Sequence, residues 1–477
     1  MTTLTIEFVN ESFFKIDSDI LILKNISDRF KFRADGYMFD RRYIAGFWDG
    51  YIKPLNLKTG MIHYGYIKNV IKYCKENQID FSFKNFKKHE ANNVLNISDL
   101  GLKFQPYDYQ ENALELITKY NRGVILSATG SGKSLITYLL LEMFKINNCK
   151  NVLIVVPNAY LVKQLKSDFK DYDTLDKPWV DDVHLLYDGA DKNINTFCTI
   201  ATWQTLQNIK DDSFFEKYDA LIIDECHQAK AAQLIKICEK CVNSKFKVGL
   251  TGSLENVKTS TETVLGLFGE TFHITTSKEL RDNKILSSVK VIALIRNLES
   301  PELNTYEEEC EFIQNDIKRF DLILKLANNI NNENTLVLFN RVDKFGKPLS
   351  EYVKANSNKT VYFVNSSTKI AERDKIVKEM ENGVNIVVFA TYPIFSTGVN
   401  VKNLHNLIFA SSTKSFVKVV QSIGRILRLH DSKEFGVRVF DIVDNLHCSE
   451  NNYSFKHYIK RKAIYEKEKI PLIEKII

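Results

Sequence analysis

The sequence predicts an α/β protein with two tandem parallel sheets, preceded by a small α+β domain. Three observations lead to this fold class. Short apolar runs alternate with helical patterns from about residue 124 onward. The runs are continuously apolar, as in parallel strands that helices cover on both faces. The first 86 residues differ, because they are rich in aromatic and basic side chains and suggest short strands and turns.

Two sets of apolar runs supply the strands. The expected strands of the first sheet are VILSA (124–128), VLIVVP (152–157), TIAT (199–202), ALIID (220–224) and KVGLTG (247–252). Those of the second sheet are TLVLFN (335–340), TVYFVN (360–365), NIVVFAT (385–391), NLIFAS (406–411) and VRVFDIVD (437–444). Each set occupies about 150 residues, the size of one domain. The segment 273–300 between them is expected to be a hinge.

These patterns divide the chain into four parts. The N-terminal domain is expected over residues 1–86, followed by a polar linker over 87–104. The first α/β domain is expected over 105–280 and the second over 281–477. Apart from the loose duplication of the two α/β halves, the sequence contains no internal repeat.

The composition is that of a soluble globular protein, with 44% apolar and 26% charged residues among 477. The net charge of +6 suits nucleic-acid binding without requiring it. No run of about 18 uncharged apolar residues occurs, and the N-terminus lacks a basic start followed by an apolar core. We therefore expect no membrane contact and a cytoplasmic location.

The stretch ALIIDECHQAK places Asp224, Glu225, Cys226 and His227 directly after an apolar run. A Cys–His pair suits a thiol nucleophile with its base, or half of a zinc site. Two adjacent carboxylates suit a metal ion and an activated water molecule. These four residues alone do not decide between the three chemistries.

A zinc site would need further ligands, and Cys238-x-x-Cys241 lies close by in the sequence. Leu234, Ile235, Cys238, Cys241 and Val242 recur at helical spacing, which favours one buried helix face over a metal site. The eight cysteines are otherwise scattered among apolar segments, so we expect them to be reduced and largely buried.

The first strand leads directly into SATGSGKS and then into the apolar helix LITYLLLEMF. Strand, glycine-containing loop, Lys-Ser and helix are the context that a phosphate-binding loop requires. Gly130 and Gly132 would let backbone N–H groups surround phosphates at the helix N-terminus. Lys133 would reach the β- and γ-phosphates, and Ser134 would bind Mg²⁺. Ser127 replaces the first glycine of the full pattern, so a Gly/Ser turn capping an ordinary helix is the alternative.

The DECH cluster supplies what a phosphate loop lacks. Asp224 would hold Mg²⁺, and Glu225 would position and deprotonate the attacking water. The cluster is therefore predicted to be a Mg-ATP site, and its thiol takes no part in nucleophilic chemistry. We expect His227 to link the nucleotide site to the neighbouring domain by hydrogen bonding.

The motifs together resemble the superfamily-2 helicases and translocases of the DExH group. Those in the first half are YDYQ (107–110), ATGSGKS (128–134), VVPNAYLVKQ (155–164), ATWQTL (201–206), DECH (224–227) and LTGSL (250–254). Those in the second half are LFNRVD (338–343), FSTGVNV (395–401) and QSIGRILR (421–428). Their order and spacing make the resemblance specific. It implies that both α/β domains are RecA-like and that ATP and Mg²⁺ are the cofactors.

The resemblance also assigns residues. It implies nucleotide contacts from Gln110, which would read the adenine, and from Thr129, Gly130, Ser131, Gly132, Lys133, Ser134, Gly398 and Gln421. It implies coupling of hydrolysis to domain movement through His227, Thr251 and Ser253. It implies nucleic-acid contacts from Pro157, Asn158, Thr202, Gln204, Asn340 and Thr391. Arg425 and Arg428, three residues apart on one expected helix face, would be arginine fingers for the γ-phosphate.

The N-terminal stretch ADGYMFDRRYIAGFWDGYIKPLN, with FSTGVNVKNLH and QSIGRILRLH, is similar to the recombination and repair helicases of T-even-type bacteriophages. This implies action on branched DNA: fork regression, Holliday-junction migration and R-loop unwinding, with RNA present in hybrids. Asn400 replaces an acidic residue often found in its motif. The sequence TGS, rather than SAT, favours the DNA-directed translocases over the RNA helicases of the DEAD-box group.

The residue chemistry of the N-terminal segment gives a separate indication of DNA binding. Its aromatic side chains are interleaved with Arg41, Arg42 and Lys53, which could contact the phosphate backbone. The alternative is that most of these aromatics form the core of a small domain. A second basic stretch, 456–462, could line the strand path or be a solvated helix.

Three other functions remain open at this stage. The chain could pump duplex DNA without separating strands, or act as an RNA helicase, since RNA can satisfy the same backbone contacts. It could also be a strand-annealing or binding protein whose ATPase only switches affinity. A stimulating partner protein is compatible with the sequence, but no residue identifies one.

Overall fold

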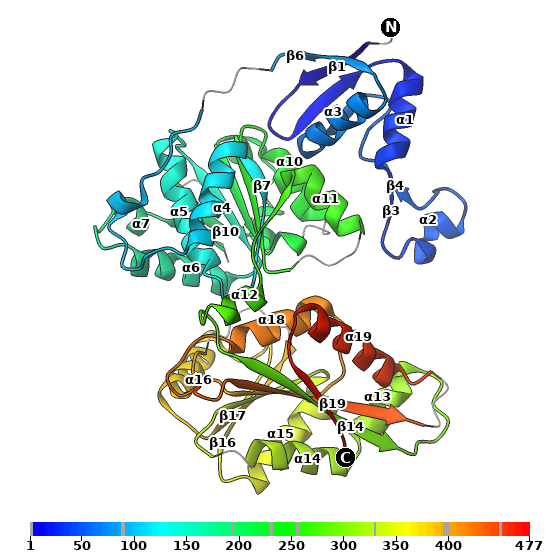
Figure 1. Ribbon diagram of the computed structural model, residues 1–477, viewed down its shortest axis with the longest axis vertical. Helices are drawn as coiled ribbons and strands as arrows, with labels where there is room; N and C mark the ends of the chain where they lie inside the picture. Colours follow the sequence, from blue (N-terminus) through cyan, green and yellow to red (C-terminus); the bar gives the residue numbers. More distant parts are fainter. Residues whose placement is uncertain are drawn as a thin grey trace. The chain divides into compact units, whose positions relative to one another are not determined.

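The structure is a computed structural model. It describes residues 3–86, 91–187, 189–191, 195–228, 232–253, 258–328, 331–392, 394, 401–447 and 451–477. The chain divides into two compact units. The first unit joins Met1–Ser127 to Gly132–Ile274, and the second joins Ala128–Ser131 to Thr275–Ile477. Figure 1 shows the N-terminal domain in blue, the first sheet in cyan and green, and the second sheet in green to red.

The N-terminal domain is a four-stranded mixed sheet with strand order β5-β2-β1-β6. Its strands are β1 (Thr3–Phe8), β2 (Phe13–Asp17), β5 (Met61–His63) and β6 (Asp80–Lys84). Alternate side chains of β1 and β2, among them Leu4, Ile6 and Phe14, enter one core. Helices α1 (Ile20–Phe30) and α3 (Ile67–Glu76) supply the rest of that core.

A small subdomain extends from this sheet. Strands β3 (Phe32–Arg33) and β4 (Tyr51–Ile52) pair antiparallel, and between them lies α2 (Arg41–Ile44). The guanidinium of Arg33 lies over the rings of Tyr37 and Tyr51, 4.5 and 4.1 Å from their centroids. The guanidinium of Arg42 likewise lies 4.9 Å from the ring centroid of Trp48, so cations stacked on aromatic rings help to hold the subdomain together.

Buried polar contacts fix the N-terminal domain to the first α/β domain within the same unit. Arg122 forms an ion pair with Glu11 at 2.6 Å. The Lys247 ammonium donates to the hydroxyl of Ser12 at 2.6 Å, and that hydroxyl donates to the carbonyl of Glu239 at 2.9 Å. Lys247 is almost fully buried, and burial lowers its pKa to about 8.

The first α/β domain contains a parallel seven-stranded sheet with strand order β13-β7-β12-β11-β8-β10-β9. Its strands are β7 (Arg122–Ser127), β8 (Val152–Val156), β9 (His184–Leu186), β10 (Cys198–Thr202), β11 (Ala220–Asp224), β12 (Phe246–Thr251) and β13 (Thr271–Thr275). The five predicted strands are present, together with β9 and β13, which were not predicted.

Helices cover both faces of this sheet because its strands are apolar on both sides. In β8, Val152, Ile154 and Val156 pack with one core, whereas Leu153 and Val155 pack with another. The helices of the first core are α4 (Asp108–Tyr120), α5 (Lys133–Ile146), α6 (Ala159–Tyr172) and the short α7 (Pro178–Asp181). Those of the second include α8 (Trp203–Leu206), α9 (Ser213–Glu216), α10 (Ala232–Lys240) and α11 (Lys258–Phe268).

The second unit contains another parallel seven-stranded sheet, with strand order β16-β17-β15-β18-β19-β14-β20. Its strands are β14 (Val289–Leu298), β15 (Thr335–Phe339), β16 (Thr360–Val364), β17 (Ile386–Thr391), β18 (Asn406–Phe409), β19 (Val437–Leu446) and β20 (Leu472–Ile476). The two sheets confirm the predicted fold class. The expected hinge over 273–300 is corrected, because it contains α12 (Ser277–Asp282) and β14, which pairs with β19 over ten residues.

Helices lie on both faces of the second sheet as well (Figure 1). Helices α14 (Ile317–Asn328) and α15 (Lys347–Asn356) share a core with β15 and β17. Helix α19 (Tyr453–Lys467) packs on the other face, where Tyr458 contacts Ala293 and Val443. Helices α13 (Tyr306–Gln314), α16 (Ile370–Asn382) and α18 (Phe416–Ile426) complete the layers.

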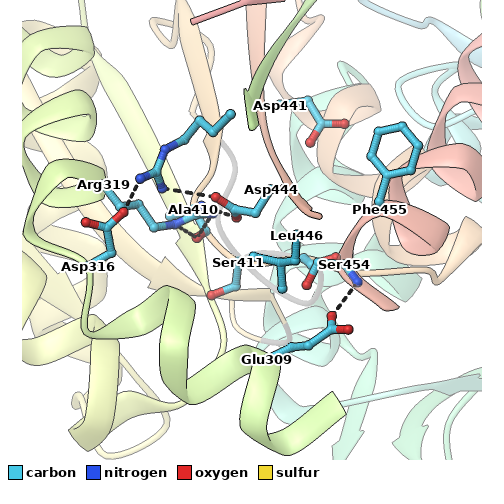
Figure 2. A network of polar contacts seen from close by, with 12 residues as sticks. Glu309, Asp316, Arg319, Ala410, Ser411, Asp441, Asp444, Leu446, Ser454 and Phe455 are labelled. Carbon is cyan, nitrogen blue, oxygen red and sulfur yellow. Dashed lines mark hydrogen bonds and ion pairs between the residues drawn. The ribbon is translucent and has the colours of Figure 1, made fainter. Parts of the chain in front are cut away.

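Buried ion pairs stabilise the interior of the second unit (Figure 2). Asp444 accepts from Arg296 at 3.0 Å and also from Arg319, which donates to the carbonyl of Ala410 at 2.7 Å. Arg461 forms a bidentate pair with Asp441, at 2.9 and 2.8 Å. Arg461 belongs to the basic stretch 456–462, for which the sequence suggested either a strand-binding surface or a solvated helix. Because Arg461 is only 1% exposed, neither interpretation holds for this residue.

In the part of the chain that the structure describes, no helix is both long enough and apolar enough to cross a lipid bilayer.

Candidate functional site

Several predicted site residues of the first α/β domain gather at one edge of its sheet. Ser127, Thr202, Asp224 and Thr251 are the last residues of β7, β10, β11 and β12. Because the strands run parallel, their carboxyl ends meet at the same edge, where ligands of open α/β sheets bind.

The loop between β7 and α5 has the backbone of a phosphate-binding turn. Gly130 and Gly132 have φ angles of +86° and +78°, a region that side chains rarely adopt. Lys133 begins α5, and its ammonium donates to the carbonyl of Ser127 at 3.2 Å. The loop thus presents an ammonium group and a helix N-terminus together, both favourable to phosphate.

Gln110 lies against this loop. Its side-chain oxygen accepts from the Tyr107 N–H at 2.9 Å, at the start of α4. Its side-chain nitrogen lies so close to Gly132 that a Cβ there would be 2.5 Å away. Gln110 is therefore buried beside the phosphate loop, and its contact with adenine stays a prediction.

The hydroxyl of Ser134 lies 2.6 Å from the phenolic oxygen of Tyr172, at the end of α6. Sequence reasoning missed Tyr172, which lies 38 residues farther along the chain and belongs to no motif. Ser134 and Asp224 offer hard oxygen donors, a hydroxyl and a carboxylate, which is the donor chemistry that Mg²⁺ prefers.

The two predicted catalytic carboxylates lie side by side after β11. The Glu225 N–H donates to the Asp224 carboxylate at 2.9 Å. Glu225 has a left-handed backbone with φ of +51°, an uncommon conformation that concentrates at functional sites. Burial and the neighbouring Glu225 raise the pKa of Asp224 to about 6, and Lys133 opposes that rise. Burial and a second carboxylate both disfavour the charged form of Asp224, whereas a nearby cation favours it.

The three predicted coupling residues contact one another. His227 Nδ1 lies 3.0 Å from the hydroxyl of Thr251 and 3.1 Å from the carboxylate of Glu225. Thr251 in turn donates to the carbonyl of Ser253 at 2.9 Å. The structure thus joins Glu225 to the end of β12 through His227, and the coupling role itself stays a prediction.

Cys226 turns away from this site into the core. A Cβ added to Gly249 of β12 would lie 2.8 Å from the sulfur of Cys226, so the thiol fills the space beside that strand. Burial raises the pKa of the Cys226 thiol well above its ordinary value, which opposes thiolate formation. Cys238 lies on the buried face of α10, with Leu234 and Ile237, while Cys241 lies beyond the end of that helix.

The nucleic-acid residues predicted in the first α/β domain also lie at this sheet edge. Asn158 follows β8 and caps α6 by accepting from the Leu161 N–H at 3.0 Å. Thr202 ends β10, and Gln204 donates to the carbonyl of Pro157 at 3.0 Å. The contact between Gln204 and Pro157 joins the two predicted motifs, and their binding to nucleic acid stays a prediction.

In the second unit, Asn340 and Thr391 lie at the carboxyl ends of β15 and β17. The Asn340 N–H donates to the hydroxyl of Ser411 at 3.0 Å. Gly398 and Asn400, both in the motif 395–401, lie outside the described residues.

The two predicted arginine fingers do not share one helix face. Gln421 and Arg425 belong to α18, but this helix ends at Ile426. Arg428 lies beyond the end and pairs in a short β-bridge with Leu286. The prediction from their spacing was wrong because α18 ends two residues before Arg428, whose backbone pairs with Leu286 instead.

In the N-terminal subdomain, two of the three predicted basic contacts have acidic partners. Arg42 pairs with Asp40 at 2.8 Å, and this hydrogen bonding lowers the pKa of Asp40 to about 2. Lys53 pairs with Asp49 at 3.0 Å. Arg41 is exposed on α2.

The aromatic side chains of this segment differ in exposure, and most of them are half-buried. Phe32 is buried in the domain, whereas Phe39 and Phe47 are 82% and 88% exposed. Two large, exposed apolar rings beside basic groups have the composition of a surface that stacks on unpaired bases.

The chain matches three protein families. The family "DNA helicase UvsW, N-terminal" matches residues 3–84, "Type III restriction enzyme, res subunit" matches 103–256, and "Helicase conserved C-terminal domain" matches 318–430.

Individual relatives extend these matches. The ATP-dependent DNA helicase uvsW of Enterobacteria phage T4 is 30% identical over 99% of both chains. The DNA 3'-5' translocase XPB2 of Sulfurisphaera tokodaii is 22% identical over 71% of this chain and 82% of its own. The crystal structure of T4 UvsW is 28% identical, covers 100% of this chain and 99% of its own, and gives a TM-score of 0.51.

Proposed function

The chain belongs to the UvsW family of ATP-dependent DNA helicases, and from this premise we propose that it moves branch points in DNA. The proposed reactions are fork regression, Holliday-junction migration and R-loop unwinding, in phage recombination, repair and replication control. The proposed location is the cytoplasm of the host cell. The observation that carries the proposal is the phosphate loop, whose Lys133 lies close enough to Asp224 to lower the pKa of that carboxyl. The chain that contains this loop is similar over its full length to a DNA helicase.

ATP hydrolysis is assigned to groups of both units. Lys133 would hold the β- and γ-phosphates, and Ser134 and Asp224 would hold Mg²⁺, which neutralises charge on the phosphates. Glu225 would accept the proton of the attacking water. Thr129, Gly130, Ser131 and Gly132 would surround the phosphates with backbone N–H groups, and Gln110, Gln421 and Gly398 would complete the nucleotide contacts.

Arg425 and Arg428 would stabilise the charge that develops on the γ-phosphoryl group in the transition state. His227 is hydrogen-bonded to Thr251 and lies close to Glu225. A shift of Glu225 on ATP hydrolysis would therefore move His227 and, through it, the end of β12.

The DNA strand would cross the carboxyl ends of both sheets. Pro157, Asn158, Thr202, Gln204, Asn340 and Thr391 would contact its backbone. The N-terminal domain would add Arg41, Arg42 and Lys53. Its buried attachment through Glu11 and Ser12 supports a fixed contact that moves with the first unit.

The name of the XPB2 relative includes 3'-5' translocation, and we infer the same polarity for this chain. The alternatives are a duplex translocase without strand separation, an RNA helicase and an ATP-switched annealing protein. An accessory protein could stimulate any of these activities.

The test is strand displacement with ATP on forked, four-way and R-loop substrates beside linear duplexes of equal length. Branched DNA processed at least tenfold faster than linear duplex would support the proposal. Equal rates on linear duplex, or ATP-dependent movement without strand separation, would favour the duplex translocase. A preference for duplex RNA would favour the RNA helicase.

A further inference from the structure

The segment that follows α18 carries Arg428 outside the helix. Because α18 ends at Ile426, the carbonyl groups of its last turn have no partner within the helix. The position of Arg428 is therefore not set by helical geometry. Other groups must fix the backbone at this point if the guanidinium is to reach a defined place.

Lys433 holds this backbone from one side. Its ammonium donates to the carbonyl of Ile426 at 2.7 Å and to the carbonyl of Arg428 at 2.8 Å. Lys433 is only 7% exposed, so these contacts are shielded from water. One side chain thus bridges the carbonyl groups on both sides of Leu427.

Ser287, just before β14, holds the same backbone from the other side. Its N–H donates to the carbonyl of Leu427 at 2.7 Å, and its hydroxyl donates to the carbonyl of Arg428 at 3.3 Å. Three consecutive carbonyl groups, from Ile426 to Arg428, therefore have donors. The backbone of Arg428 is fixed, while its side chain remains only partly buried.

A tight turn over residues 430–436 places the Lys433 side chain against the end of α18. The Lys433 N–H donates to the carbonyl of His430 at 3.0 Å, and the Gly436 N–H donates to the carbonyl of Lys433 at 2.9 Å. Gly436 has a φ of +72°, and a Cβ there would lie 2.1 Å from the hydroxyl of Ser288. The turn therefore has little freedom to carry Lys433 elsewhere.

Removing the Lys433 ammonium from water is unfavourable in free energy. Burial lowers the pKa of Lys433 to about 7, while Glu381 opposes this and Arg428 adds to it. The carbonyl groups at a helix C-terminus are a favourable site for a cation, which partly offsets the cost. An apolar side chain of similar length would avoid the desolvation but leave the carbonyl of Ile426 without this donor and the carbonyl of Arg428 with only the hydroxyl of Ser287.

We propose that Lys433 is a positioning residue for Arg428, fixing the point at which that arginine leaves α18. The proposal rests on the proposed role of Arg428 in ATP hydrolysis. Lys433 lies beyond residues 318–430, which match the helicase C-terminal family, and it belongs to none of the sequence motifs.

The test compares Lys433→Met with wild-type protein in steady-state ATP hydrolysis with DNA. A small displacement of a charged group costs up to about 100-fold in rate, so we expect kcat to fall about 30-fold. The KM for ATP should stay within about twofold, because nucleotide contacts in the first unit are unchanged. Lys359→Met removes another partly buried lysine of the second unit, whose pKa burial also lowers, and should leave kcat unchanged.

A double variant separates positioning from general stability. If Lys433 acts through Arg428, adding Lys433→Met to Arg428→Ala should lower kcat by less than about twofold more. A further fall of about 30-fold would show an independent effect and overturn the proposal. So would a wild-type kcat for Lys433→Met.

Ser287→Ala tests the same idea if Lys433→Met does not fold. This change removes only the hydroxyl bond to the carbonyl of Arg428, and we expect kcat to fall about threefold, again with no further loss beside Arg428→Ala. If Ser287→Ala has the wild-type kcat in that case, the proposal fails. A wild-type rate for Arg428→Ala alone would instead refute the finger role in the proposed function.

Discussion

The two parallel sheets each place an aspartate at or near the carboxyl end of a strand, but the two aspartates have opposite surroundings. Asp444 of β19 is 4% exposed and bonded to the guanidinium groups of Arg296 and Arg319 (Figure 2). Asp224 of β11 lies beside a second carboxylate, and burial raises its pKa to about 6.

We propose that this difference distinguishes a structural carboxylate, Asp444, from a functional one, Asp224. The charge of Asp444 is balanced by two arginines, so we assign this carboxylate to the stability of the folded state and not to ligand binding. Asp224 and Glu225 keep two negative groups together, an arrangement that a cation and its bound water would relieve. An aspartate at the end of a strand therefore indicates a functional site only when the charges of its neighbours are known as well.

The largest effect is expected for Glu225→Gln, which removes the proposed base but keeps the side chain's shape. Turnover should fall about 10⁴-fold, while ATP and DNA affinities stay near wild type. Steady-state ATPase rates and fluorescent-nucleotide binding measure the two properties. Residual hydrolysis near the wild-type rate would remove Glu225 from this role.

Arg428→Ala should lower turnover about 10³-fold and spare nucleotide binding, because the arginine would act mainly in the transition state. Arg461→Ala is the structural counterpart in the same unit, where a buried arginine pairs with Asp441. It should lower the unfolding temperature instead. A loss below about tenfold for Arg428→Ala would indicate a structural arginine.

Asp444→Asn should destabilise the second unit, because it leaves buried guanidinium groups without their full counter-charge. Breaking a buried ion pair costs about 3 kcal/mol or more, which should lower the unfolding temperature by roughly 6 °C or more. Scanning calorimetry measures the shift, and Asp28→Asn, in an exposed pair with Lys31, is the control. An unchanged unfolding temperature would contradict the comparison.

The smallest effect is expected for Phe39→Ala and Phe47→Ala in the N-terminal subdomain. Loss of one stacked base should weaken binding to forked DNA about fivefold or more and leave ATP affinity unchanged. Phe435→Ala removes a ring that is equally exposed but lies in the second unit. If all three variants bind forked DNA like wild type, the two rings have no stacking role.

The sequence predicted the parts of the site that are contiguous. The loop from Ser127 to Ser134 and the pair Asp224–Glu225 each lie within a few residues, and every predicted strand of both sheets is present. The chemistry of a phosphate loop depends on local backbone and helix polarity, which short motifs encode.

Features that depend on distant partners could not be predicted from the sequence. Tyr172 reaches Ser134 only through the packing of α6 beside α5, and Arg428 leaves its helix because Leu286 pairs with it. The sequence predicts a hinge over 273–300, but part of this segment is strand β14, whose partner β19 lies more than 130 residues farther along the chain.

The most direct test measures ATP turnover per folded molecule for wild type, Asp224→Asn and Asp444→Asn, with and without a four-way DNA junction. The account predicts that Asp224→Asn abolishes turnover in both conditions, whereas Asp444→Asn retains wild-type turnover and stimulation by the junction below its unfolding temperature. Near wild-type turnover for Asp224→Asn, or loss of turnover in folded Asp444→Asn, would contradict the assignment of the ATP site to the first sheet.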